Sequence, residues 1–183
     1  SQAAEPLGRT RGRETVQTLY QNAGVYALPE IYLPVEAGIA PSAGSNAGEA
    51  SLGASLSPLN LAVAAASISA QGARPQPLLV LDMRLQGEAW RAFAQFQPAS
   101  AVFSPRAAQE TMRLLADSLR LTWHTLAVIP KSDAQQTAYT WFVGGSNPGW
   151  QGSPLALALV LEGNQPDLAL QIGWQVLQIA MQP

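Results

Sequence analysis

Apolar residues recur at helical spacing in four stretches of the chain, at residues 13–23, 59–71, 106–119 and 167–181. Two of these stretches follow a Ser-Pro pair, Ser57-Pro58 and Ser104-Pro105. A serine hydroxyl accepts a hydrogen bond from a free backbone N–H at a helix start, and proline has no N–H to leave unsatisfied there. We therefore expect four helices, two of them with well-defined first turns.

The second helix is apolar on most of its surface. Its run of alanine and leucine places Leu61, Ala64, Ala65 and Ile68 on one face, and Gly72 follows as a stop signal. A helix that is apolar nearly all round is buried on most sides. We expect this helix to be the most buried one in the fold.

Three stretches rich in β-branched and aromatic residues predict strands at 121–129, 138–143 and 155–161. The connections are short enough for neighbouring antiparallel strands. The fold class predicted is therefore α+β, a small antiparallel sheet flanked by helices. The segments between the main elements predict a loop at 42–55, a short extended piece at 78–83, a short helix at 88–96, a polar turn at 131–137 and a turn region at 144–154.

The composition narrows the classes of function. The 183 residues include no cysteine, so a thiol nucleophile and a cysteine-ligated zinc site are excluded. Arg9, Arg11 and Arg13 are flanked by Glu5 and Glu14, which does not make the basic surface that nucleic acid requires. We expect no nucleic-acid partner and no cofactor.

A metal site is not expected either, because the carboxylates show no ligand spacing. The carboxylates considered are Glu110, Asp117, Asp133, Glu162 and Asp167. No apolar stretch reaches the length of a membrane span. Because the chain begins at Ser1, we expect residues 1–183 to be a single, partial domain, with any membrane anchor upstream. Only 12% of the residues are charged, which suggests a surface partly covered by another segment or by a partner.

Three phrases carry a resemblance to a known family. Residues 57–62 read Ser-Pro-Leu-Asn-Leu-Ala, residues 140–144 read Thr-Trp-Phe-Val-Gly, and residues 157–162 read Leu-Ala-Leu-Val-Leu-Glu. They resemble, in the same order, Ser/Thr-Pro-Leu-Gln-Leu-Ala, Ala-Trp-Phe-Val-Gly and a strand ending in Val-Val-Glu in penicillin-binding transpeptidases. The resemblance covers most of the chain and implies the C-terminal part of a β-lactamase-like transpeptidase domain.

The catalytic motifs of that family are where the sequence departs from it. The family carries Ser-x-x-Lys, Ser-x-Asn and Lys-Thr-Gly. The single lysine, Lys131, has Val128 three positions before it, and Ser-x-Asn is also absent where the family would place it. At the place of Lys-Thr-Gly the resemblance gives Trp123, His124 and Thr125. These three are candidates, by position, for a substrate groove, and no residue is assigned a catalytic role.

Two tempting residues have simpler interpretations. His124 lacks an obvious acid and nucleophile beside it, so we expect a partly exposed structural histidine. Among the five tryptophans, Trp150 follows Pro148-Gly149 in a turn and is expected to be the most exposed, where it could contact a partner.

The expected function is that of a penicillin-binding-protein-like domain in a cell-wall or cell-surface protein, located outside the cytoplasm. It would be catalytically inactive alone and act as a scaffold or interaction module. Its partners would be the upstream part of the same protein or other cell-wall proteins. Two alternatives stay open: the C-terminal piece of an active peptidoglycan D,D-transpeptidase with its nucleophile upstream, and an unrelated α+β binding domain.

Overall fold

The computed structural model describes residues 13–29, 31, 33–39, 56–92, 98–116, 121–130 and 138–182. Four helices are present in this part of the chain: α2 (Arg13–Asn22), α3 (Pro58–Ser69), α4 (Pro105–Leu115) and α5 (Pro166–Ala180). The main sheet contains β5 (Thr122–Pro130), β6 (Ala138–Ser146) and β7 (Ala156–Glu162), antiparallel and in that order. The predicted α+β class, with three adjacent antiparallel strands, is confirmed.

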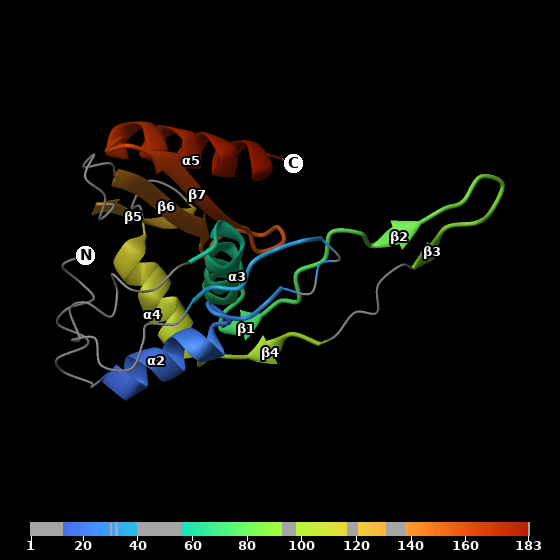
Figure 1. Cartoon of the computed structure of the whole chain (residues 1–183), viewed down its shortest axis with the longest axis horizontal. Helices are drawn as coiled ribbons and strands as arrows, with labels where there is room; N and C mark the ends of the chain where they lie inside the picture. The colour runs from blue at the N-terminus through green and yellow to red at the C-terminus, as the bar shows by residue number, and fades with distance from the viewer. Residues whose placement is uncertain are drawn as a thin grey trace.

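The sheet separates two layers of helices (Figure 1). Helix α5 packs on one face, while α3 and α4 pack on the other. Each interface has its own core. Trp123 packs with Ala65, Ala108 and Met112 on the α3 side, and Phe142 packs with helix α5 on the opposite side. This alternation follows from the period of two along a strand, which sends neighbouring side chains to opposite faces.

Strand β6 continues beyond its predicted end at residue 143. Gly144 and Gly145 suggested a turn, but both lie in the strand and are buried. A Cβ on Gly145 would collide with the Leu155 carbonyl oxygen and with Ser69 Oγ of helix α3. A Cβ on Gly144 would lie 2.7 Å from the Trp123 carbonyl oxygen of β5. Both glycines are therefore explained by neighbours that approach the strand closely, and not by a turn of the chain.

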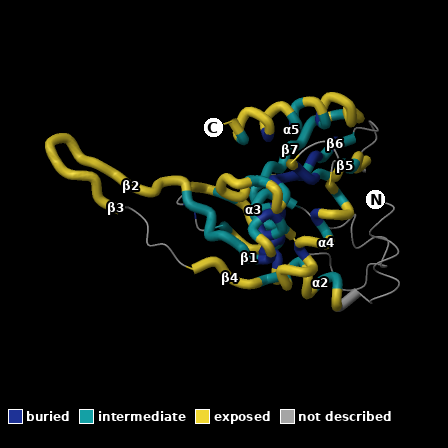
Figure 2. The backbone as a smooth tube through the Cα atoms, turned by 180° about the vertical axis from the view of Figure 1, so that it is seen from behind, coloured by how far each residue is buried: buried dark blue, intermediate teal, exposed yellow. Residues whose placement is uncertain are grey.

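Two short strand pairs form an extension of the fold. Strand β1 (Ala73–Arg74) pairs with β4 (Ser100–Ala101), and β2 (Asp82–Met83) pairs with β3 (Arg91–Ala92). The β2–β3 pair projects from the body as an arm (Figure 1), and all residues from 79 to 92 are exposed (Figure 2).

The short helix predicted at 88–96 is wrong over its described part, residues 88–92. Gly87 has φ 83°, a left-handed conformation that reverses the chain, and Arg91–Ala92 then returns as strand β3. The helix predicted at 106–119 ends at Leu115, because Ala116 takes an extended conformation and bridges to Trp123. Residues 93–97, the predicted loop 42–55 and the predicted turn 131–137 lie outside the described residues.

Helix α3 is the most buried of the described helices, as predicted, but its fully buried positions are largely polar. Of the predicted apolar face only Ala65 is fully buried, and Asn60, Ser67 and Ser69 are buried with it. Each polar side chain has a partner: the Asn60 amide donates to the Gly24 and Ala27 carbonyl oxygens, and the Ser67 hydroxyl donates to the Val63 carbonyl oxygen. These hydrogen bonds offset the desolvation of the buried groups.

Candidate functional site

Strand β5, which carries the three candidate residues, lies at an edge of the sheet. It pairs with β6 on one side, and in the described part of the chain its other side makes a single bridge, from Trp123 to Ala116. The Asn147 N–H donates to the Leu121 carbonyl oxygen, which fixes the alternation of hydrogen bonds along the strand. It follows that His124, Leu126 and Val128 direct their backbone N–H and C=O groups away from β6, and that Leu126 and Val128 lie beyond the bridge to Ala116.

Trp123 is a core residue. Its side chain is 1% exposed and packs against α3 and α4. The indole Nε1–H donates a 3.0 Å hydrogen bond to the hydroxyl oxygen of Ser69 on helix α3. The position that carries a lysine in the family phrase is therefore occupied by a buried tryptophan, which cannot contact a ligand in a groove.

His124 points to the opposite face of the sheet, toward helix α5. Its ring stacks on Phe142 at 5.7 Å between centroids and an interplanar angle of 6°, and meets Trp174 edge-on at 5.4 Å. The residue is half-buried. These aromatic contacts agree with the predicted role of a structural histidine.

Thr125 is the one candidate side chain of the three that is exposed, and it lies opposite Val143 of β6. It stands where the family phrase has glycine. Of the three candidate side chains only that of Thr125 therefore remains accessible, beside a backbone edge that no further strand covers in the described part of the chain. A strand edge of this kind can accept an extended peptide through main-chain hydrogen bonds.

Ser69 carries a contact that the sequence did not predict. Its hydroxyl accepts the Trp123 indole N–H from 54 positions away along the chain, and a small polar residue on an alanine-rich helix gives no sign of such a contact. The only signal was the run of serines on α3, which periodicity alone assigns to no partner.

With these contacts established, the fold can be compared with known proteins. Penicillin-binding protein A from Mycobacterium tuberculosis superimposes with a TM-score of 0.79 over 98% of this chain and 49% of its own, at 20% identity. The chain has the fold of penicillin-binding proteins. Penicillin-binding protein 3 from the same organism, in complex with aztreonam, gives a TM-score of 0.75 at 14% identity, over 97% of this chain and 49% of its own.

A peptidoglycan glycosyltransferase from Burkholderia ambifaria matches with a TM-score of 0.63 at 17% identity, over 89% of this chain and 53% of its own. The chain thus spans about half the length of the solved penicillin-binding proteins it matches. No family model matches the sequence, and no curated protein matches it. The structural likeness confirms the resemblance found in the sequence at the level of fold.

The carboxylates considered as metal ligands do not form a common site in the described part of the chain. Glu110 forms an exposed ion pair with Arg113 at 2.9 Å, and Glu162 and Asp167 are exposed. Asp117 and Asp133 lie outside the described residues. Within the described ranges no three histidine or carboxylate side chains converge as a metal site would require. None of the helices in these ranges combines the length and the apolar character needed to cross a bilayer.

The prediction that Trp150 is the most exposed tryptophan is wrong. Trp150 is half-buried, because its ring packs over Gly152 and its Nε1–H donates to the Ser153 carbonyl oxygen. Trp90, on the β2–β3 arm, is 67% exposed. Its ring lies 5.5 Å from the guanidinium carbon of Arg84 in a cation–π contact.

Proposed function

We propose that this chain is a penicillin-binding-protein-like module that binds and does not catalyse. In this proposal it belongs to a cell-wall or cell-surface protein and works outside the cytoplasm as a scaffold or interaction module. The observation that carries the proposal is the buried Trp123. The Trp123 side chain fills the core beneath α3 and donates a 3.0 Å hydrogen bond to Ser69. This position therefore has no room for a substrate-binding cation.

The chemistry of the sequence supports the same proposal. Acylation of a serine requires a base within hydrogen-bond reach of the hydroxyl and donors aimed at the developing oxyanion. The single lysine, Lys131, follows Pro130 and has no serine at the family spacing. Thr125 adds a side chain where the family phrase leaves the strand bare. The chain therefore lacks the groups for transpeptidation by itself.

The part of β5 that remains suitable for binding is its backbone. Leu126 and Val128 offer donors and acceptors at the edge of β5 that faces away from β6, where the described part of the chain places no further strand. The partners we propose are extended segments, either from the upstream part of the same protein or from another cell-wall protein. Such segments would bind by adding a strand to the sheet.

The direct test is covalent labelling. The chain is incubated with excess fluorescent penicillin and its intact mass is measured, with a fluorescence scan of the denatured protein as a second readout. We expect no mass increase and no labelled band. A stoichiometric adduct on one serine of this chain would overturn the proposal and make the chain an enzyme.

The same measurement on a longer protein that includes upstream sequence separates the alternatives. Penicillin-binding protein A from M. tuberculosis is known as an acyl-enzyme with imipenem. If the longer protein forms an adduct upstream of Ser1 while this chain does not, the chain is a piece of an active D,D-transpeptidase. The alternative of an α+β domain with an unrelated fold is wrong, because the fold matches that of penicillin-binding proteins over nearly the whole chain.

A further inference from the structure

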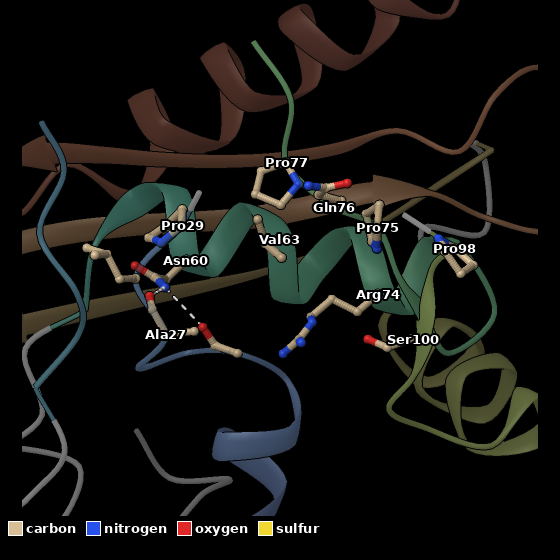
Figure 3. Close-up of a pocket in the computed structure, with 12 residues that line it drawn as sticks. Ala27, Pro29, Asn60, Val63, Arg74, Pro75, Gln76, Pro77, Pro98 and Ser100 are labelled. Carbon is tan, nitrogen blue, oxygen red and sulfur yellow. Dashed lines mark hydrogen bonds between the residues drawn. The ribbon is translucent and has the colours of Figure 1, made fainter. Parts of the chain in front are cut away.

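A cavity of about 360 Å³ lies beside helix α3, at the base of the β2–β3 arm (Figure 3). It shares no residue with strand β5. Its walls come from the turn after α2, from α3 and from the segments that contain β1 and β4. Most of its lining is apolar, with Val63 and a group of prolines that includes Pro29, Pro75, Pro77 and Pro98. Its volume is within the range of small-ligand sites.

One cation lies in this cavity, and the fold holds it in place. Arg74 of strand β1 donates from Nη1 to the carbonyl oxygen of Asn22 at 3.1 Å. Its side chain also packs against Gly24, where an added Cβ would lie 2.7 Å from Nη1. Gly24 has φ 75°, so the backbone there both favours glycine and leaves room for the arginine.

The wall opposite the arginine is fixed as well. Asn60, 2% exposed, donates from its side-chain amide to the carbonyl oxygens of Gly24 at 3.0 Å and Ala27 at 2.7 Å. Figure 3 shows the Asn60 and Arg74 side chains apart from each other along helix α3, with Val63 between them. The guanidinium is therefore preorganised, which reduces the entropy lost when a ligand binds.

The charge of Arg74 has no carboxylate partner among the described residues. The ion pairs in that part of the chain join Glu88 to Arg91 and Glu110 to Arg113. Arg74 uses one N–H on the Asn22 carbonyl oxygen, and the guanidinium carries five such donors. Ser100 lies directly opposite Arg74 in the β1–β4 pair, and its hydroxyl borders the same cavity.

We propose that this cavity binds a small carboxylate with an apolar body, the chemistry of a peptide C-terminal residue. The planar guanidinium fork suits the two oxygens of a carboxylate, and the Ser100 hydroxyl can donate to the same group. The proline and valine walls suit an aliphatic side chain. A single cation matches a single negative charge, which disfavours a phosphate dianion.

The test compares N-acetyl-L-leucine with N-acetyl-L-leucinamide, which differs from it only in lacking the carboxylate charge. Each is titrated into the chain while the amide resonances of Gly24 and Ser100 and the Arg74 Nε–H are followed by NMR. We expect saturable shifts with the carboxylate and at least about tenfold weaker binding with the amide. Equal binding of both compounds, or no saturable shift with either, would overturn the proposal.

Variants distinguish a binding role of Arg74 from a purely structural one. Arg74→Gln is expected to weaken carboxylate binding roughly tenfold or more, whereas Arg106→Gln, an exposed arginine on α4, should leave it unchanged. Since Arg74→Gln also removes the hydrogen bond to Asn22, Ser100→Ala is the second variant. It leaves that bond intact and is expected to weaken binding several-fold with an unchanged melting temperature. Unchanged affinity in Ser100→Ala together with Arg74→Gln, or tighter binding of inorganic phosphate than of the carboxylate, would refute the site as proposed.

Discussion

Replacing Trp123 by lysine would restore the cation of the family phrase, and we expect it to unfold or severely destabilise the domain without creating activity. The indole is 1% exposed and lies against Ala65, Ala108 and Met112. Loss of a buried aromatic ring of this size costs about 3–5 kcal/mol when the site cannot collapse. The lysine stem recovers part of that packing but leaves an ammonium group buried without a counter-charge, which adds about 3–5 kcal/mol.

A penalty of this size is comparable with the whole free energy of unfolding of a typical domain, about 5–15 kcal/mol. For a chain of 183 residues each kcal/mol corresponds to roughly 2–4 °C in melting temperature. We therefore expect Trp123→Lys to melt roughly 10 °C or more below the parent chain, or to lack a cooperative transition. Urea unfolding followed by far-UV circular dichroism measures the difference, and fluorescent penicillin labelling reports activity in the same samples.

Two matched variants locate the effect. Trp123→Phe keeps an aromatic ring but deprives Ser69 of its donor, so a loss of about 1–3 kcal/mol is expected. Thr125→Gly restores the other family residue at an exposed position and should change stability by no more than about 1 kcal/mol. A Trp123→Lys variant as stable as Thr125→Gly would show that the core does not need the tryptophan, and burial at this position would no longer support the proposal that the chain binds without catalysing.

Three further predictions concern the rest of the fold. Gly173→Ala should lower the free energy of unfolding measured in urea, because its Cβ would lie 2.6 Å from Phe142 ring atoms. The overpacking costs about 1–3 kcal/mol, which exceeds the gain of about 1 kcal/mol in helix propensity. A more stable variant would contradict this packing. Burial, and then the neighbouring Tyr20, raises the pKa of Tyr26 above its ordinary value of 10.0. The neutral phenol therefore contributes stability that is complete below pH 10 and is lost as the pH rises through the folded-state pKa. Tyr26→Phe should therefore flatten the alkaline dependence of the free energy of unfolding on pH. An unchanged dependence in the variant would disprove the assignment. Trp90→Ala removes only an exposed cation–π contact and should shift stability by less than about 1 kcal/mol, whereas a larger loss in a thermal melt would mean that the arm packs on the body.

The helix starts could be predicted because their causes are local. The Ser57 hydroxyl accepts from the Asn60 N–H at 3.1 Å, and the Ser104 hydroxyl accepts from the Ala107 N–H at 3.2 Å, as the Ser-Pro pairs indicated. Both contacts span three residues, so the sequence window that predicts the helix contains both partners. The period of two in the three strands is local in the same sense.

The errors arose where tertiary contacts decide the structure. The segment 88–96 has a pattern that suits a short helix as well as one side of a hairpin, and the left-handed Gly87 selects the hairpin. Gly144 and Gly145 are typical of a turn until the approach of the β5 backbone to Gly144 and of helix α3 to Gly145 is known. The Asn60 amide reaches carbonyl groups 33 and 36 residues away, and no spacing rule reveals such partners.

In the candidate site the backbone edge of β5 does not depend on the side chains that the strand carries. In β5 the side chains of Trp123 and His124 go to the two opposite faces of the sheet, where each contributes to a separate core. The backbone groups that point to the open edge are independent of those side chains, because their direction is set by the pairing with β6. A core tryptophan at position 123 therefore adds packing without closing the edge, and a lysine there would leave the direction of these backbone groups unchanged. Selection for binding an extended partner would maintain the edge, and it would place no requirement on the residues that acylation needs.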